Sequence, residues 1–234
     1  MRRVMLVAAM AMLGAACARD EDATADDTTM GDSAAAQAMA DDPDMRPEGA
    51  SGVPAGFAGR VDRASQLLSD ARYTELPDGK WEVVTGPHHI LYQPGDTASG
   101  TYTVNATLEQ MESPAHPESF GVFIGGQDLE SEGQRYGYFM VRGTGDYLIK
   151  TREGEGTSNV IGWTASPAVP KSDATGKASY QLTVQVGQDS VRFSVNGTPV
   201  TSLSRGAIPT DGVAGVRIGH NLHVTTTRVS IDRS

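Results

Sequence analysis

The sequence has one cysteine among 234 residues, Cys17, and it lies close to the N-terminus. The rest of the chain therefore has no disulfide framework and no catalytic thiol. The chain also lacks a Gly-x-Ser-x-Gly serine elbow and a basic stripe with interleaved aromatic residues. These absences argue against thiol- and serine-based hydrolysis and against nucleic-acid binding.

The first 17 residues have the pattern of an export signal. Arg2 and Arg3 precede a short apolar run, Val4 to Leu13, and three small residues follow it. Such a run is too short to span a bilayer. Cys17, directly after the small residues, resembles a bacterial lipobox cysteine, which is acylated, although Gly14 stands where leucine is preferred. We predict a lipoprotein-type signal over 1–17 with lipidation at Cys17; the alternative is an ordinary secretory signal cleaved at about the same place.

The following segment is acidic and has few large apolar side chains. Residues 18–50 contain ten Asp or Glu against two Arg. A segment of this kind cannot bury enough apolar surface to offset the entropy lost on ordering. We therefore predict a disordered acidic linker over 18–55 and one folded domain over 56–234.

The domain contains many short alternating segments and almost no helical pattern. In Tyr180–Asp232, Leu182, Val184 and Val186 alternate with polar residues, and Asn196-Gly197 predicts a tight hairpin. We expect this stretch to form one antiparallel meander. About twelve strands in all are too many for one open sheet, so the sequence predicts an all-β sandwich of two antiparallel sheets. Further strands are predicted at 81–85, 89–92, 102–108, 120–125, 136–142, 147–151 and 160–164.

Several motifs occur in an order that carries a family resemblance. They are YGYFMVR, GTGDY, LIKTR and GWTASPAV, followed by L-x-V-x-V…V-x-F-x-V-N-G-x-x-V over Leu182–Val200. Over residues 72–234 the chain resembles the concanavalin A-like lectin/glucanase superfamily, and within it the laminin-G-like and 3-keto-glycoside-hydrolase-like domains of bacterial exported lipoproteins. The resemblance implies a jelly-roll sandwich and says little about chemistry.

Five residues on two neighbouring predicted strands form the candidate ligand-binding site. Tyr136, Tyr138 and Arg142 share one face of the first strand, and Lys150 and Arg152 share one face of the second. Aromatic rings beside cations suit an anionic or hydroxyl-rich ligand. The alternative is that the tyrosines are ordinary strand residues, half-buried on a sheet face.

No catalytic, metal or cofactor site is predicted. The stretch nearest to the Glu-x-Asp-x-x-Glu strand of β-glucan hydrolases is Asp128–Glu132, but its order differs and glycines bracket it as a loop. The five histidines lack the spacing of a two-His-plus-carboxylate site. Trp163 is expected to pack under a loop.

Together these observations favour an exported, lipid-anchored and non-catalytic binding module of the bacterial cell envelope. Its partners would be a glycan or a cell-envelope protein, and the membrane through its N-terminal lipid. The alternative is a glycoside-acting enzyme of the 3-keto-glycoside hydrolase type, with catalytic residues that the sequence does not identify.

Overall fold

The computed structural model describes residues 42–233, in which the folded unit begins at Pro43 rather than at the predicted residue 56. The backbone N–H of Met45 donates to Oδ1 of Asn221 (2.8 Å), and Oδ1 of Asp44 lies 2.7 Å from Nδ1 of His220. The chain directly before residue 56 thus packs on the turn formed by His220 and Asn221. The predicted signal, Cys17 and residues 18–41 of the predicted linker lie outside the described residues.

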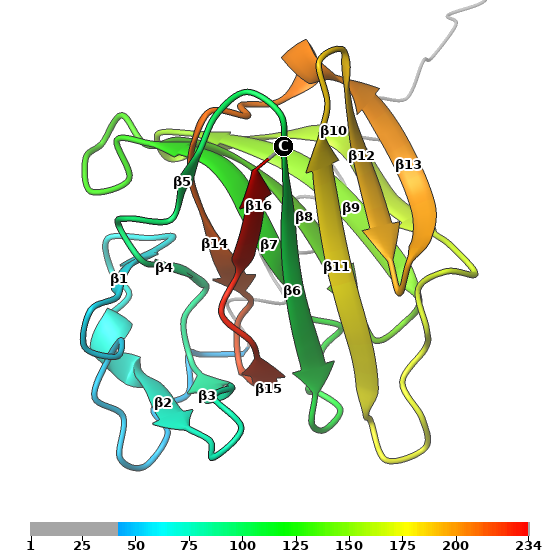
Figure 1. Cartoon of the computed structure of the whole chain (residues 1–234). Coiled ribbons are helices and arrows are strands. Elements are labelled where there is room, and N and C mark those ends of the chain that lie inside the picture. Colours follow the sequence, from blue (N-terminus) through cyan, green and yellow to red (C-terminus); the bar gives the residue numbers. More distant parts are fainter. Residues whose placement is uncertain (1–41, 234) are drawn as a thin grey trace, which may run out of the picture. The chain divides into compact units, whose positions relative to one another are not determined.

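Two antiparallel sheets of eight strands each stack face to face (Figure 1). Sheet A has the order β1-β4-β14-β7-β8-β9-β10, with β5 beside β14, and sheet B has the order β13-β12-β11-β6-β15-β3-β2, with β16 beside β6. Only two short 3₁₀ helices, η1 (Leu68–Asp70) and η2 (Arg205–Ala207), occur in residues 42–233. The predicted all-β, two-sheet antiparallel sandwich is confirmed. The strands are β1 (Ala58–Val61), β2 (Ala71–Glu75), β3 (Trp81–Thr85), β4 (His89–Tyr92), β5 (Thr97–Ala98), β6 (Tyr102–Gln110), β7 (Ser119–Gln127), β8 (Arg135–Arg142), β9 (Asp146–Glu153), β10 (Gly156–Ala165), β11 (Ala178–Val186), β12 (Ser190–Val195), β13 (Thr198–Ser204), β14 (Gly212–Ile218), β15 (Leu222–Thr226) and β16 (Ser230–Arg233).

The predicted meander of Tyr180–Asp232 is right for its first three strands and wrong for the rest. Strands β11, β12 and β13 are neighbours in sheet B, with Asn196 and Gly197 at positive φ in the second turn. The chain then crosses to sheet A for β14 and returns to sheet B for β15. Alternation shows that a strand has one buried face, but both sheets of a sandwich present such a face to the same core.

The core fills the space between the sheets. The ring centroids of Phe193 on β12 and Phe139 on β8 are 5.3 Å apart, and those of Tyr180 and Phe120 are 5.6 Å apart. Phe193 is 1% exposed, whereas its neighbour Arg192 points to solvent. Adjacent strand residues point to opposite faces, so Phe193 packs across the sandwich as its alternation predicts.

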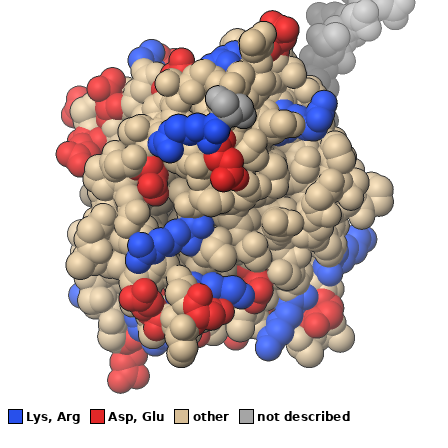
Figure 2. All heavy atoms as spheres, in the orientation of Figure 1, with Lys and Arg blue, Asp and Glu red and all other residues tan. Residues whose placement is uncertain are grey.

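The outer faces of the two sheets differ in character. On sheet B the outer face is polar, with Thr103, Asn105 and Gln185 among its side chains, and it faces the viewer in Figure 2 with charges of both signs intermixed. The outer face of sheet A instead buries a second apolar cluster, separate from the core. A sandwich needs only one apolar face per sheet, so the packing of the two sheets does not require this second cluster on the outer face of sheet A. The cluster consists of Ile90, Tyr92, Phe123, Leu129, Tyr136, Tyr138, Met140 and Leu148.

Candidate functional site

The five predicted ligand-binding residues lie together on the outer face of β8 and β9. Tyr136 pairs with Arg152, Tyr138 with Lys150, and Arg142 with Asp146. The two tyrosines are buried, at 1% and 6% exposure, but under the outer face and not between the sheets. The tyrosine rings therefore form a packed base rather than an open groove, and Arg142 and Lys150 remain half-buried at its edge.

A buried charge cluster lies on this base. Asp62, just after β1, receives two hydrogen bonds from Arg217 of β14, at 2.8 Å and 2.5 Å. Arg217 also donates to the hydroxyl of Tyr136 (3.0 Å), and its guanidinium carbon lies 4.7 Å from the ring centroid of Tyr138. Arg152 lies 3.3 Å from the same carboxylate and donates to the Asp62 carbonyl at 2.8 Å. The donors of both arginines are thus largely used inside the protein.

The electrostatics of this cluster favour a charged Asp62. Burial pushes the pKa of the Asp62 carboxyl up, but the charges and hydrogen bonds of Arg217 and then Arg152 hold it well below its usual range. Burial raises the pKa of the Tyr136 and Tyr138 hydroxyls, which therefore stay neutral at pH 7. A permanently ionised, doubly paired carboxylate orients its neighbours and cannot serve as a general acid.

Trp163 on the edge strand β10 is exposed, at 41%, so the expectation that it packs under a loop is wrong. The guanidinium carbon of Arg142 lies 4.0 Å from its ring centroid, and Nε of Arg142 lies 3.2 Å from Oδ2 of Asp146. The pairing of β10 with β9 has two register shifts, and Trp163 lies within the second, between Ile161 and Thr164. Such irregularities re-aim side chains, and here they coincide with an aromatic ring beside the outer face of β8 and β9.

The histidines near this face pack against each other and lie close to a carboxylate. His88 stacks on His220, with ring centroids 5.7 Å apart, and its Nε2 lies 3.9 Å from the Glu118 carboxylate. Burial lowers the pKa of His88 to about 4, so it is neutral at pH 7. Among residues 42–233, no group of three or more His, Cys, Asp or Glu side chains is placed to hold a metal ion.

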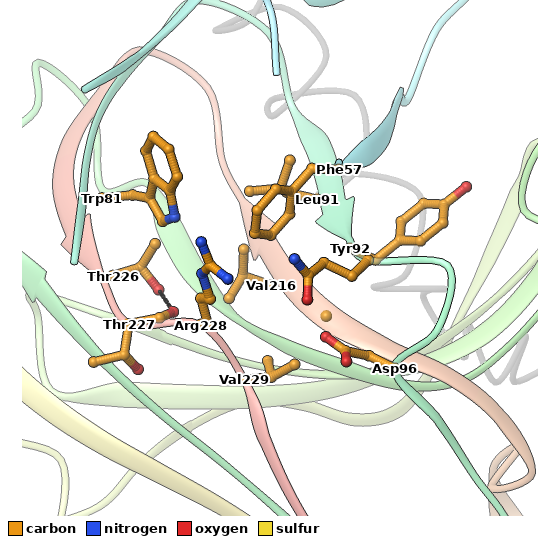
Figure 3. A pocket seen from close by; sticks show the side chains of 12 residues that line it. Phe57, Trp81, Leu91, Tyr92, Asp96, Val216, Thr226, Thr227, Arg228 and Val229 are labelled. Atoms are coloured by element: carbon orange, nitrogen blue, oxygen red, sulfur yellow. Dashed lines mark hydrogen bonds between the residues drawn. The ribbon is translucent and has the colours of Figure 1, made fainter. Parts of the chain in front are cut away.

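A narrow pocket opens between the two sheets near β3 and β15 (Figure 3). Trp81, Phe57 and Leu91 supply apolar walls, and Arg228 lies across the opening with its guanidinium carbon 5.3 Å from the Phe57 ring centroid. The indole N–H of Trp81 is buried there, without a partner among the described residues. The free space is only about 10 Å³, the room of a single water molecule. This pocket is therefore a weaker candidate for ligand binding than the outer face of sheet A.

Three residues of the site were not predicted from the sequence: Asp62, Arg217 and Trp163. Asp62 and Arg217 are 155 positions apart, and neither belongs to a recognisable motif. Trp163 could have been found from the sequence, because its predicted strand follows the two strands that carry the tyrosines and cations and pairs with the second of them.

The fold of the described residues is similar to that of jelly-roll sandwiches of the concanavalin A-like kind. No family model matches the chain, and no curated protein matches it. Carbohydrate-binding module CBM66 from Bacillus subtilis superposes with a TM-score of 0.57 at 8% identity, over 76% of this chain and 96% of that chain. A Bacillus subtilis protein of unknown function with a galectin-like fold gives a TM-score of 0.51 at 14% identity, over 75% and 94% of the two chains. At these identities the likeness establishes the fold. No helix within residues 42–233 is long and apolar enough to cross a membrane.

Proposed function

We propose that this protein binds a carbohydrate on the outer face of sheet A, across strands β8, β9 and β10. The observation that carries the proposal is the exposed ring of Trp163 next to Arg142, beside a buried aromatic base that the sandwich core does not need. An exposed aromatic ring flanked by hydrogen-bonding side chains is the usual composition of a sugar site.

Each side chain of the proposed site has a defined role. The Trp163 ring stacks on the apolar face of a sugar, while Arg142 and Lys150 donate hydrogen bonds to its oxygens. Lys150 lies four residues along β9 from Asp146, the partner of Arg142, and this spacing corresponds to about 13 Å. A site of this length suits an oligosaccharide better than a single sugar.

The buried cluster supports these contacts from below. Tyr136, Tyr138 and Arg152, predicted as direct ligand contacts, instead form the base of the site together with Asp62 and Arg217. Rigid support of this kind holds binding side chains in place and lowers the entropy lost on binding. One protein with the same fold is described as a carbohydrate-binding module, which agrees with the proposal.

A glycoside-acting enzyme is not favoured by any observation on this face. Glycosidases need a carboxylic acid with a raised pKa opposite a second carboxylate. Asp62 has the opposite property, because Arg217 and Arg152 outweigh its burial and hold its pKa below the usual range. The pKa of Asp146 is likewise lowered, by hydrogen bonds from Thr144 and Arg142 and by the charge of Arg142.

We further propose that the protein is exported and anchored in the bacterial cell envelope through a lipid on Cys17. Diacylation supplies the two chains that stable membrane attachment requires. The Cys17→Ala variant should then move from the membrane fraction to the aqueous fraction of a cell lysate. Wild-type protein that already fractionates without the membrane would contradict the anchor.

The binding proposal is tested by titrating a panel of acidic and neutral oligosaccharides into the full chain and measuring the heat of binding by isothermal titration calorimetry. Trp163→Ala should weaken binding of the best ligand by about tenfold or more, because stacking on one aromatic ring contributes about 1–3 kcal/mol. Leu67→Ala is the matched control, since Leu67 is an exposed apolar residue, 56%, outside sheet A. Equal affinities of the two variants for every ligand, or no binding by wild type, would overturn the proposal.

A further inference from the structure

A second pocket, of about 370 Å³, lies at the other end of the outer face of sheet A. It is formed where Tyr92 of β4 and Val213 of β14 meet the loop that follows β7. Its volume is within the range of small-molecule sites, and the pocket is not lined by Trp163, Arg142 or Lys150, the direct contacts of the proposed glycan site. The residues that line it are Tyr92, Pro94, Gly126, Asp128, Leu129, Glu130, Ser131 and Val213.

The loop that forms one wall is held in a fixed conformation. Asp128 adopts a positive φ of 53°, and the N–H of Ser131 returns to its carbonyl at 2.9 Å to close a tight turn. Arg60 of β1 donates to the carbonyls of Leu129 (3.2 Å) and Ser131 (2.5 Å). The exposed carboxylates of Asp128 and Glu130 are therefore mounted on an anchored rim and not on a free loop.

Tyr92 gives the pocket a polar group without a partner. The residue is 4% exposed, and its ring packs edge-on against Phe123, with the two ring centroids 6.1 Å apart. Figure 3 shows its hydroxyl directed away from the pocket between the sheets. No hydrogen bond joins this hydroxyl to another residue of the described part of the chain. Burial and then the charge of Glu130 raise the pKa of Tyr92, so its hydroxyl stays neutral at pH 7.

The chemistry of the walls defines the ligand. Two carboxylates and a neutral hydroxyl offer several hydrogen-bond acceptors, while Nη1 of the nearby cation Arg60 donates to two backbone carbonyls. Pro94, Leu129 and Val213 supply an apolar surface. A group that only donates hydrogen bonds and carries positive charge satisfies these acceptors, and an anion is repelled.

We propose that this pocket binds a primary ammonium group carried on a small, partly apolar body. The ammonium donates to Glu130 and to the hydroxyl oxygen of Tyr92, and the body lies on Leu129 and Val213. An amino sugar and an alkylamine share this chemistry, and the two can be distinguished experimentally. The site lies at β4, β14 and the β7–β8 loop, whereas the proposed glycan site lies on β8–β10, so Trp163→Ala should leave amine binding unchanged.

The test is a titration of the full chain with glucosamine, glucose and n-butylamine, observed through the NMR signals of the Tyr92 ring. Glucosamine and butylamine should shift these signals with saturation in the millimolar range, and added salt should weaken both. Glucose should bind at least about tenfold more weakly, since it lacks the charge-assisted hydrogen bond. Stronger binding of glucosamine than of butylamine would identify an amino sugar as the ligand class, and the reverse order an alkylamine.

Two variants of one loop provide a matched comparison. Glu130→Gln removes the carboxylate that lines the pocket, and Glu132→Gln makes the same charge change on an exposed side chain that does not line it. Glu130→Gln should weaken glucosamine binding by about fivefold or more, and Glu132→Gln by less than twofold. Tyr92→Phe, which keeps the ring, should also weaken it. Equal effects of the two glutamate variants, equal binding of glucose and glucosamine, or no shift of Tyr92 with any ligand would overturn the proposal.

Discussion

Arg217 of β14 holds both carboxylate oxygens of Asp62, a residue 155 positions earlier in the chain, at 2.8 Å and 2.5 Å. The Arg217 residue is 6% exposed and the Asp62 side chain 19%, so most of this bidentate pair is shielded from water. It ties the segment after β1 to the middle of sheet A, directly above the tyrosines of β8. The same ion pair therefore stabilises the fold and fixes the side chains under the proposed binding face.

Removing the charge of Asp62 should destabilise the protein strongly. In Asp62→Asn, Arg217 and Arg152 stay buried without their counter-ion, and breaking a buried pair in this way costs about 3–5 kcal/mol. The free energy of unfolding from urea denaturation measures this loss. Asp78→Asn, at an exposed carboxylate 3.7 Å from Lys80, is the control and should cost less than about 1 kcal/mol. Similar losses for both variants would show that the buried cluster contributes little.

Stability should fall as the pH drops from about 6.5 to about 4, because His89 is buried in its neutral form. Burial lowers the pKa of His89 to about 4, while Tyr73 donates to its Nε2 and its Nδ1 donates to the carbonyl of Pro87 at 2.9 Å. In the unfolded chain His89 takes up its proton at about pH 6.5. Between pH 6.5 and pH 4 the unfolded state therefore binds more protons than the folded state and is favoured as the pH falls. The contribution of His89 reaches about 3 kcal/mol at pH 4.

Replacing His89 tests this pH dependence. His88 has a pKa lowered to about 4 by burial as well, so His89→Gln should remove about half of the slope of unfolding free energy against pH between 6.5 and 4. The exposed His116→Gln is the matched control. An unchanged slope in His89→Gln would mean that this ring is accessible to protons in the folded protein.

Phe193→Ala should open a cavity between the sheets. Phe193 is 1% exposed and packs on Phe139 across the sandwich, so its removal should lower the unfolding free energy by about 3–5 kcal/mol. Arg192→Ala, on the adjacent outward position, should cost less than about 0.5 kcal/mol. Chemical denaturation of both variants measures the difference, and equal costs would contradict the strand orientation.

Residues 43–51 should contribute to stability. A chain that starts at Gly52 loses the hydrogen bond of Met45 to Asn221, the contact of Asp44 with His220 and the 3.1 Å ion pair of Arg46 with Asp70. It should melt several degrees below a chain that starts at Pro43, since each hydrogen bond contributes about 0.5–1.5 kcal/mol. Identical melting temperatures in a calorimetric scan would show that these contacts are not formed in solution.

The fold class was predictable because its signals are local. The alternation of Leu182, Val184 and Val186 and the Asn196-Gly197 turn indicate strands and a hairpin from a few residues each, and the structure has both. The contact between the positions of Tyr138 and Lys150 was predictable for the same reason, since a short hairpin between β8 and β9 makes them cross-strand partners.

Tertiary structure alone decided which sheet each late strand joins and what lies over the tyrosines. Sequence alternation is the same for a strand of either sheet, so the crossing of β14 to sheet A could not be read from it. The Asp62–Arg217 pair depends on that crossing, because it brings Arg217 to a segment 155 residues away. The sequence by itself indicated most of the strands after residue 80, the Asn196-Gly197 turn and the shared face of five residues, but not β1, β2 or β5. The path of the chain between the two sheets decided that the tyrosines became a buried base, with Trp163 exposed beside them.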